Sequence, residues 1–371
     1  MTVGNNGGTH LSGPVLVIGT GLLGASIGLG LRARGIDVVL SDISPSTQAV
    51  AQDIGAGRAL DPSDADFSPE LVVVAAPPDV TATLVAEALE AHPRAVVVDI
   101  ASVKDAVLQD LTKSVNDDAR SRYVGTHPMA GREKSGPVAA RAELFTSMPW
   151  VICASPESSA QAVRTAEALA IDLGAVVARM SAEEHDASVA VISHLPQVLS
   201  SLVASRLQDT PAHALSLAGN GLRDVTRIAA SDPRLWVQIL SANAGRLVDI
   251  LYGVREDLNR LIGTLESPLA DGSRLDLAQL ISEGNIGQAR IPGKHGAPPE
   301  AFARMTVLVD DVPGQIARLL TEIGEHGINL EDLRLEHSPG RQVGMVEISV
   351  LPGKRHELMD FLTSKGWKVV Q

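Results

Sequence analysis

Cysteine and aromatic residues are scarce in this 371-residue sequence, and each scarcity excludes a class of protein. The single cysteine, Cys153, cannot form an intramolecular disulfide, so a disulfide framework is excluded and a reducing compartment is expected. Because aromatics make up only 2% of residues, the cores must be built from Ala, Val, Leu and Ile. With 45% hydrophobic and 20% charged residues, the composition is that of a folded globular protein.

Basic residues are too few for a protein that binds nucleic acid. Lys and Arg number 31 against 44 Asp and Glu, the net charge is −13, and no Lys/Arg-rich run occurs. Residues 1–13, MTVGNNGGTHLSG, lack the basic start and apolar core of a signal peptide, and we predict a disordered tail there. No segment approaches the roughly 20 consecutive apolar residues of a membrane span. We therefore expect a cytoplasmic protein that binds neither nucleic acid nor membrane.

Short β-rich apolar runs alternate with helical patterns over residues 14–180. The runs are apolar throughout, as in strands buried on both faces of a parallel sheet; they are PVLVIG, IDVVLSD, ELVVVAAPP, AVVVDIAS, RYVGTH, WVICA and AVVARM. This alternation predicts a doubly wound α/β domain of the Rossmann type. Residues 181–283 lose the β signal and form long amphipathic helices, which predict an all-α dimerisation domain. Pro196 lies inside one of these helices and should kink it.

A Gly/Pro-rich stretch over residues 284–301 is predicted to be a linker to a third domain. In residues 302–371, apolar runs and helical patterns follow the order βαββαβ. This order is typical of a ferredoxin-like split βαβ unit.

The first β-rich run leads into the pattern Gly19-x-Gly21-x-x-Gly24, a helix follows, and the next run ends in Asp42. This context is the one that a dinucleotide fingerprint requires. The first glycine permits a tight turn, the second lets a pyrophosphate approach, and the third lets helix and strand pack closely. Asp42 can accept hydrogen bonds from the adenosine ribose and would repel a 2′-phosphate, so we expect NAD rather than NADP. A glycine-rich turn without a ligand is the alternative.

The stretch GTHPMAGREKSG at residues 125–136 combines turn-forming residues with a histidine and three charged residues. We expect it to be a loop at the carboxyl end of the sheet, where a nicotinamide would bind. Together with the glycine pattern and the segments DIASVK (99–104), HDASVAVISHLPQ (185–197) and GLRDVTRIAASDPRLW (221–236), it resembles the prephenate/arogenate dehydrogenase family of tyrosine biosynthesis. Residues 302–371 resemble an ACT domain, an amino-acid-sensing regulatory fold, through DVPGQIARLL and HGINLEDL.

The resemblance implies an NAD-dependent oxidative decarboxylation of prephenate to 4-hydroxyphenylpyruvate. Such chemistry needs a neutral base at the ring hydroxyl, a cationic grip on the carboxylates and an adjacent nicotinamide. His127 matches the family's catalytic histidine, which accepts the hydroxyl proton. Ser102 matches a serine that orients this histidine and the nicotinamide, although a helix N-cap is another interpretation of it.

The same resemblance implies the substrate contacts. Arg227 would grip the ring carboxylate and Arg223, one helical turn away, the side chain, unless the two form a solvated helix face. Gln197 stands where many prephenate-using relatives have histidine, which leaves prephenate and arogenate both open. Trp236 would form an apolar wall or pack in the core. Further implied contacts are Thr126, Glu133 and Asp186 for the substrate, and Thr20, Leu22, Leu23, Ala76 and Pro77 for the cofactor.

Regulation and alternative functions complete the prediction. The ACT resemblance implies a tyrosine or phenylalanine effector near Asp311, Gly314, Gln315 and Asn329, with a module that serves only for assembly as the alternative.

His185 and His194 are interpreted as hydrogen-bonding residues, and no metal is expected because there is neither an HExxH motif nor a Cys/His cluster. A homodimer is expected. A non-catalytic NAD and amino-acid sensor is a second hypothesis, and another Rossmann dehydrogenase, acting on a hydroxy acid or an imine, is a third.

Overall fold

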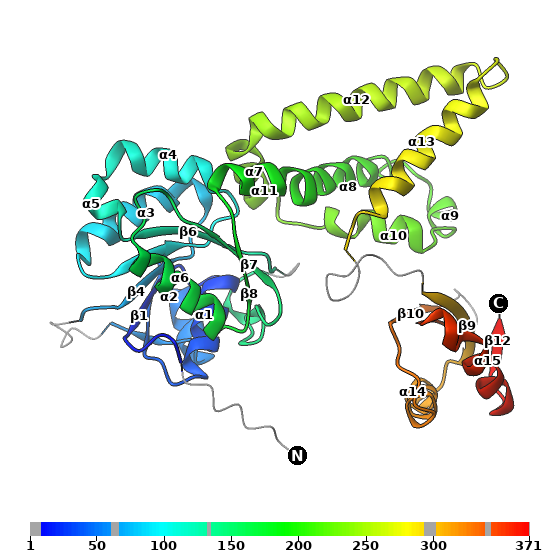
Figure 1. Cartoon of the computed structure of the whole chain (residues 1–371), viewed down its shortest axis with the longest axis horizontal. Helices are drawn as coiled ribbons and strands as arrows, with labels where there is room; N and C mark the ends of the chain where they lie inside the picture. Colours follow the sequence, from blue (N-terminus) through cyan, green and yellow to red (C-terminus); the bar gives the residue numbers. More distant parts are fainter. Residues whose placement is uncertain (1–8, 61–66, 132–134, 293–301, 338–342, 371) are drawn as a thin grey trace. The chain divides into compact units, whose positions relative to one another are not determined.

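The structure, a computed structural model, describes residues 9–60, 67–131, 135–292, 302–337 and 343–370. The chain divides into two compact units, Met1–Arg255 and Glu256–Gln371. The first unit holds the larger sheet together with the helices that follow it, up to α11 and the start of α12 (Figure 1). The second unit holds a smaller sheet near the carboxyl end of the chain.

The first unit is built on an eight-stranded sheet in the order β3-β2-β1-β4-β5-β6-β7-β8. The strands are β1 (Val15–Ile18), β2 (Val38–Ser41), β3 (Arg58–Ala59), β4 (Leu71–Val74), β5 (Val96–Asp99), β6 (Tyr123–Pro128), β7 (Pro149–Cys153) and β8 (Val176–Arg179). From β1 the chain first adds β2 on one side and later β4 on the other. This reversal is the switch point at which doubly wound sheets bind ligands. The predicted Rossmann-type sheet is confirmed.

Strand β7 departs from the predicted parallel arrangement. It pairs antiparallel with β6, with His127 opposite Val151, whereas the other neighbouring strands that pair in this sheet are parallel. A parallel neighbour needs a long crossover, usually a helix. In the described part of the β6–β7 connection only a short 3-10 helix, η1 (Pro137–Ala139), is present, so the chain turns back on itself. The prediction of a parallel sheet is wrong at this pair.

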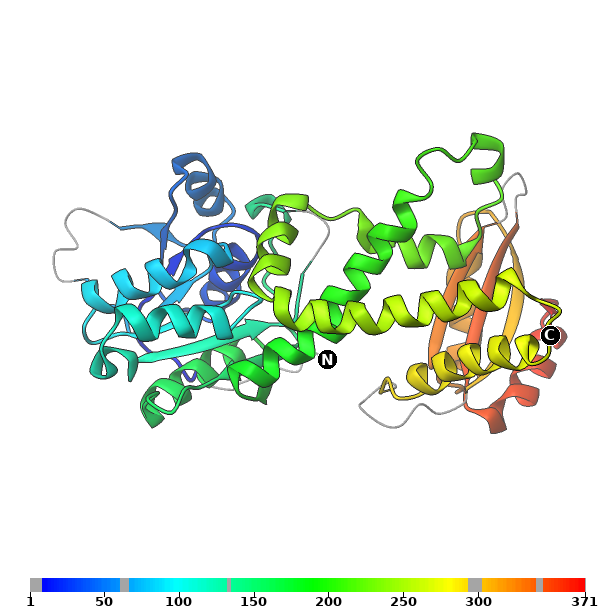
Figure 2. The same ribbon diagram turned by 90° about the horizontal axis from the view of Figure 1, so that it is seen from above.

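Helices cover both faces of the sheet (Figure 2). Helices α1 and α6 pack on one face, and α3 and α4 lie side by side on the other. Alternate strand residues enter the two cores: Val17 faces α1 and α6, and Leu16 faces α3 and α4. Burial on both faces explains why the sequences of the central strands β1, β4 and β5 are almost wholly apolar. The helices are α1 (Leu22–Arg32), α2 (Pro45–Asp53), α3 (Pro78–Ala91), α4 (Asp105–Ser114), α5 (Asp117–Arg120) and α6 (Ala160–Asp172).

The segment before β1 is anchored to α6. Leu11 is 1% exposed and belongs to the core. The backbone N–H groups of His10 and Leu11 donate to the carboxylate of Asp172 at 3.0 and 2.9 Å. The predicted disordered tail over residues 1–13 is therefore wrong for its last part, because a buried carboxylate captures the backbone. Residues 1–8 lie outside the described residues.

A continuous helix over Ala182–Ser205 follows β8. It consists of α7 (Ala182–Val189), a π-helical segment η2 (Ala190–His194) and α8 (Leu195–Ser205). Pro196 has no N–H to donate to the Ile192 carbonyl, and the helix widens to a π turn just before it. By length and composition alone this one helix is apolar enough to cross a membrane, and 28% of its apolar window is buried inside the protein.

Further helices follow α8 in this segment. They are α9 (Ala212–Leu215), α10 (Asn220–Thr226), the 3-10 helix η3 (Arg227–Ala229), α11 (Pro233–Ala242) and α12 (Ala244–Glu266), of which α10 and η3 make the main contacts with α8. Residues 232–267 follow one helical pattern in sequence, but the helix breaks at Asn243, which is 1% exposed. The prediction of an all-α segment after the sheet domain is confirmed.

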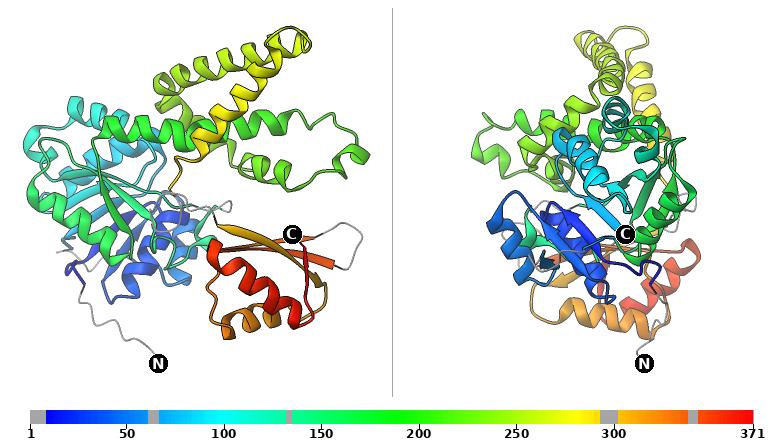
Figure 3. Two further views of the ribbon diagram at one scale, coloured as in Figure 1. Left: turned by 45° about the vertical axis from the view of Figure 1, so that its right-hand side comes forward. Right: turned by 90° about the vertical axis from the view of Figure 1, so that its left-hand side faces the viewer.

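The second unit contains α13 (Ser273–Gln288) and a four-stranded antiparallel sheet in the order β10-β11-β9-β12. Helix α13 extends past residue 284, so it continues into the predicted linker. Both helices of the sheet module lie on one face of its sheet (Figure 3). The predicted βαββαβ order is confirmed; its elements are β9 (Ala303–Asp310), α14 (Gln315–Glu325), β10 (Asp332–His337), β11 (Val343–Val350), α15 (Arg355–Ser364) and β12 (Lys368–Val370).

Candidate active site

The carboxyl ends of β1, β4, β5 and β6 share one edge of the sheet, because these strands are parallel neighbours. Along that edge lie the glycine turn after β1, Ala76 and Pro77 after β4, Ser102 after β5, and His127 near the end of β6. The structure therefore brings the predicted cofactor residues and the predicted base to the same edge. Ligands of doubly wound sheets bind at this edge.

The glycine turn leaves room for a ligand at one position and none for side chains at two others. Gly19 has φ +94°, and a Cβ there would lie 2.3 Å from the Ala75 carbonyl oxygen. A Cβ on Gly24 would lie 1.9 Å from the Gly19 carbonyl oxygen. A Cβ on Gly21 would meet nothing within 4 Å, so the backbone is open there. Gly21 caps α1 without a side-chain bond, and the first turn has no acidic residue, which suits an anion.

Asp42 is fastened to the glycine turn. Its Oδ2 accepts hydrogen bonds from the backbone N–H of Thr20 at 2.6 Å and from the Thr20 hydroxyl at 2.8 Å. Its Oδ1 accepts from the Ser44 N–H at 2.8 Å. The carboxylate thus ties the end of β2 to the turn, a role that the sequence did not indicate. A carboxylate offers about four acceptor positions, so capacity remains for a ribose hydroxyl.

His127 lies on a strand rather than on a loop. Strand β6 pairs with β5 up to Gly125 and with β7 from Gly125 to Pro128. The prediction of a loop is wrong for residues 125–128, because pairing with β7 extends the strand. The buried Thr126 donates its hydroxyl to the Asp99 carbonyl oxygen at 2.7 Å. Glu133 lies outside the described residues.

The ring of His127 begins a chain of polar contacts. Its Nδ1 lies 2.8 Å from Nε2 of His185, and Nδ1 of His185 lies 2.7 Å from Oδ1 of Asp186. The Asp186 carboxylate accepts the backbone N–H groups of Lys104 at 2.8 Å and Asp105 at 3.0 Å, at the start of α4. His185 and Asp186 are 1% and 0% exposed. Asp186 therefore caps a helix from within the protein.

The electrostatic surroundings keep His127 neutral and Asp186 charged. Burial lowers the pKa of His127 well below its ordinary value, and His185, Lys104 and His194 lower it further. Burial raises the pKa of Asp186, but the hydrogen bonds from His185 and from two backbone N–H groups outweigh burial and hold it below its ordinary value. A neutral imidazole can accept a proton, as a general base must.

A buried ion pair joins the end of β5 to the start of α4. Lys104, 1% exposed, donates from Nζ to Oδ1 of Asp99, which is 0% exposed. The Tyr123 hydroxyl donates to Oδ2 of Asp99 at 2.7 Å, and the Ala101 N–H donates to Oδ1 at 2.9 Å. Burial and the charge of Asp99 raise the pKa of Tyr123 well above its ordinary value, so it remains a donor. Both partners lie in the segment DIASVK, at its first and last positions.

One further interpretation concerns Ser102, which precedes Lys104 in the sequence. The N-cap position of α4 belongs to Lys104, not to Ser102, so the interpretation of Ser102 as an N-cap is wrong. Ser102 lies half-buried in the bend between β5 and α4. Burial raises the pKa of the Cys153 thiol to about 12, so this cysteine does not act as a nucleophile at neutral pH.

The helical segment carries the predicted substrate residues Gln197, Arg223, Arg227 and Trp236. Gln197 is 6% exposed and accepts a hydrogen bond from the Ser231 hydroxyl at 3.3 Å. Arg223 lies in the last turn of α10 and Arg227 begins η3; both residues are exposed, and both elements pack on α8, which carries Gln197. The Trp236 ring is half-buried and lies edge-on to His194, with 6.1 Å between ring centroids.

His194 confirms its interpretation as a hydrogen-bonding residue. The Asn243 amide lies 3.3 Å from Nδ1 of His194 and donates to the Asp186 carbonyl oxygen at 2.7 Å. Within the described ranges, no group of three or more His, Cys, Asp or Glu residues is arranged to hold a metal ion.

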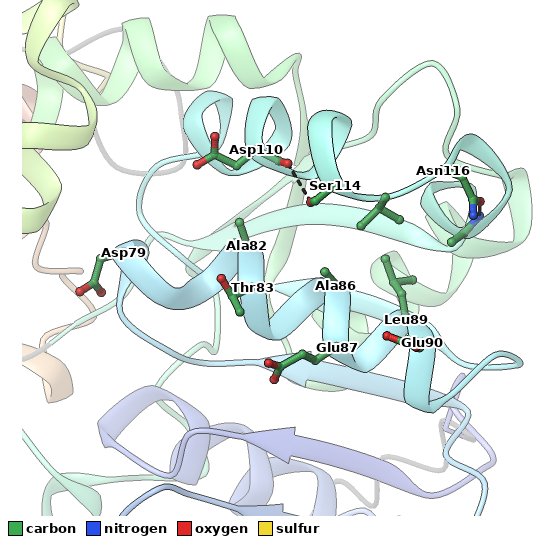
Figure 4. Close-up of a pocket in the computed structure, with 12 residues that line it drawn as sticks. Asp79, Ala82, Thr83, Ala86, Glu87, Leu89, Glu90, Asp110, Ser114 and Asn116 are labelled. Carbon is green, nitrogen blue, oxygen red and sulfur yellow. Dashed lines mark hydrogen bonds between the residues drawn. The ribbon is translucent and has the colours of Figure 1, made fainter.

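A separate hollow of about 710 Å³ lies between α3, α4 and α5 (Figure 4). It carries the carboxylates of Asp79, Glu87, Glu90 and Asp110, and the Asp110 carbonyl accepts the Ser114 hydroxyl. None of the predicted site residues lines it. Its negative lining is unsuited to an anionic substrate.

The predicted effector residues lie in two connections of the small sheet module. Asp311 and Gly314 lie between β9 and α14, where Gly314 adopts φ +90° and caps α14, and Gln315 is the first residue of α14. Asn329 lies between α14 and β10, and its amide donates to the Glu331 carboxylate at 3.0 Å.

Comparisons with known proteins agree across the sheet domain and the helical segment. The family model described as prephenate dehydrogenase, nucleotide-binding domain, matches residues 27–179, and that described as prephenate dehydrogenase, dimerization domain, matches residues 181–282. The protein named probable prephenate dehydrogenase NovF from Streptomyces niveus is 34% identical over 95% of this chain and 98% of its own. Prephenate dehydrogenase of Bacillus subtilis is 28% identical over 90% of this chain and 91% of its own.

A solved structure shows the same fold. Prephenate dehydrogenase from A. aeolicus, in complex with hydroxyphenyl propionate and NAD+, superposes with a TM-score of 0.66 at 27% identity. The match covers 76% of this chain and 100% of the other. From the two family models and the full-length relatives, we conclude that this chain belongs to the prephenate dehydrogenase family.

Proposed function

We propose that the protein catalyses the NAD-dependent oxidative decarboxylation of prephenate to 4-hydroxyphenylpyruvate, CO2 and NADH. The observation that carries this proposal is the neutral, half-buried His127 on the same sheet edge as the open glycine turn. As a family member the chain is an NAD-dependent oxidoreductase, and its full-length relatives are named prephenate dehydrogenases.

The chemistry assigns one task to each part of the site. Bound NAD would supply the acceptor for the hydride that leaves the hydroxyl-bearing ring carbon. His127 takes the hydroxyl proton as that carbon becomes a carbonyl. The bond from the ring to its carboxylate then breaks, CO2 leaves, and the electron pair of that bond makes the ring an aromatic phenolate. The phenolate oxygen takes the proton back from His127, which restores the neutral base. The glycine turn and the start of α1 would hold the pyrophosphate, and Asp42 would hold the ribose. Ala76, Pro77 and Ser102 would line the edge toward His127.

We assign the substrate carboxylates to the helical segment. Arg227 would form a bidentate hydrogen bond with the ring carboxylate, because the guanidinium group matches carboxylate geometry. Arg223 would bind the carboxylate of the side chain. Thr126 and Trp236 would border the ring. Gln197 would face the side chain, where prephenate carries a keto acid and arogenate an amino acid. Arogenate is accordingly the second candidate substrate.

A direct assay tests the reaction. Purified enzyme with NAD and prephenate should produce NADH, followed by its absorbance, whereas arogenate or NADP should give lower kcat/KM. His127→Asn should lower kcat by roughly 10² or more and leave NAD binding intact. Arg227→Lys should mainly raise KM for prephenate, because a two-pronged contact becomes a single one. A chain that binds NAD but makes no NADH with either substrate would favour the sensor hypothesis.

We also propose a homodimer formed by the helical segment, the part that matches the dimerization-domain model. Support comes from large apolar side chains that are exposed on α8, α11 and α12, among them Leu202, Val237, Val248, Leu258 and Ile262. Sedimentation analysis should give twice the chain mass, and charged substitutions at Leu258 and Ile262 should give monomers. We keep the division into residues 14–180, 181–283 and 302–371, and the cytoplasmic location, as proposals.

For the second unit we propose an ACT domain that binds tyrosine or phenylalanine. The sheet order β10-β11-β9-β12 and the connections carrying Asp311, Gly314, Gln315 and Asn329 support this proposal. Titration calorimetry of the full chain with each amino acid, compared with a chain ending at Pro292, tests it. We expect heat of binding when the amino acid is added to the full chain and none when it is added to the shorter chain. If neither chain gave heat of binding and the shorter chain had a changed oligomeric state, the module would serve only for assembly.

A further inference from the structure

We infer that His185 and Asp186 are positioning residues that fix the tautomer of His127, so that its lone pair resides on Nε2, the nitrogen left for the substrate. The inference deepens the proposed function and rests on it only for the identity of the proton that Nε2 accepts. It stands on three consecutive contacts between β6, α7 and the start of α4.

The donor and acceptor of each hydrogen bond in this series are fixed, because the series ends in the Asp186 carboxylate, which can only accept. Oδ1 of Asp186 accepts the Lys104 N–H, and Oδ2 accepts the Asp105 N–H. Backbone N–H groups cannot reverse their role, so they favour the ionised carboxylate. An ionised carboxylate at 2.7 Å from Nδ1 of His185 requires a hydrogen on that nitrogen.

The hydrogen on His185 determines the hydrogen on His127. A neutral imidazole with hydrogen on Nδ1 has a bare Nε2, which accepts. Nδ1 of His127, 2.8 Å away, must then donate, since two lone pairs would otherwise face each other. A neutral His127 that carries its hydrogen on Nδ1 has its lone pair on Nε2. A doubly protonated His185 would reverse this outcome by donating from Nε2, which would place the hydrogen of His127 on Nε2 and abolish the base.

Packing holds the two positioning residues in this arrangement. They are consecutive residues of α7, whose start is fixed by a capping box in which Ser181 and Glu184 exchange hydrogen bonds with each other's backbone. His185 is 1% exposed and Asp186 0%, so water does not compete for these contacts. When His127 takes a proton on Nε2, its Nδ1–H continues to donate to His185. The charge of Asp186 stabilises the imidazolium through the intervening ring.

Nitrogen-15 NMR spectra of the full chain with 15N-labelled histidine report the tautomer of His127 in the absence of substrate. The His127 signals are identified by their loss in His127→Asn. At neutral pH we expect a protonated Nδ1 and a bare Nε2. A protonated Nε2 in the wild-type chain would overturn the inference. Because no turnover is needed, a correct tautomer in a chain that fails to oxidise prephenate would reject the proposed function alone.

Substitutions of His185 separate positioning from folding. His185→Phe removes the acceptor, so His127 should shift toward the other tautomer and kcat should fall by roughly tenfold or more, while KM and NAD binding change little. His185→Gln, whose amide oxygen can accept from Nδ1–H, should restore the wild-type spectrum and most of kcat. His194→Phe is the matched control. His194 is a buried neighbour that takes no part in the hydrogen bonds from His127 through His185 to Asp186, so its replacement should leave the His127 tautomer unchanged. A His185→Phe chain with wild-type spectrum and kcat would refute the role.

Discussion

Replacing Asp99 by asparagine should destabilise the first unit strongly, because it removes one charge from a buried ion pair. Asp99 is 0% exposed and Lys104 1%, so water cannot solvate the ammonium group that is left behind. Asparagine has nearly the same shape. Its Oδ1 can still accept from the Ala101 N–H, and its Nδ2, in place of the oxygen that accepts from Tyr123, can donate to the Tyr123 hydroxyl oxygen. The expected loss therefore reports the uncompensated charge rather than a cavity.

The magnitude follows from the burial of both partners. Breaking a buried pair by removing one partner costs about 3–5 kcal/mol, whereas replacing both partners by neutral groups of similar size is close to neutral. We expect Asp99→Asn to lower the free energy of unfolding by about 3–5 kcal/mol. Lys104→Met should cost less, because two donors still neutralise part of the Asp99 charge. The double variant should recover most of the loss.

Urea unfolding measured by circular dichroism and by tryptophan fluorescence provides the assay. Trp150 is 0% exposed in the core of the first unit and Trp367 lies in the core of the second, so two transitions can be assigned. The double-mutant cycle should give a coupling energy of about 2 kcal/mol or more. A loss below about 1 kcal/mol for Asp99→Asn, or additive losses in the double variant, would refute the reasoning.

Three further outcomes are expected. Gly24→Ala should abolish NAD binding in a fluorescence titration, because its Cβ would lie 1.9 Å from the Gly19 carbonyl; unchanged affinity would contradict the glycine assignment. The lowered pKa of His127 predicts that kcat/KM stays level as the pH falls to about 6.5 and declines only below it, and a decline that begins at higher pH would contradict His127 as the base. Gln197→His should raise kcat/KM for prephenate relative to arogenate; an unchanged ratio would remove this position from substrate choice.

The sequence predicts the core strands and the glycine turn well because their physical constraints are local. Strands buried on both faces must be apolar at every position, as LVVV in β4 and VVVD in β5 are. Gly19 and Gly24 are required by backbone contacts within a few residues of the turn and its neighbouring strand. The βαββαβ order of the C-terminal module can also be predicted from the sequence, because a turn separates each element from the next.

The strand direction of β7 and the end of β6 could not be predicted in the same way. An apolar run such as WVICA fits a parallel or an antiparallel neighbour, and only the connection between the strands decides between them. Pairing with β7 then turns Thr126 and His127 from expected loop residues into strand residues. Likewise, the helical pattern of residues 232–267 continues through Asn243, where a buried polar contact interrupts it.

The arrangement around the base depends on contacts between distant parts of the chain. His127 and His185 are 58 positions apart, and Asp186 meets Lys104 across 82. Because one carboxylate both caps α4 and orients His185, the start of α4 and the tautomer of the base are set by the same group. Ser102 lies in the bend that leads into that helix start. A displacement of α7 would therefore disturb the base and the serine together, which couples the helical segment that is proposed to hold the substrate to the sheet edge that is proposed to hold NAD.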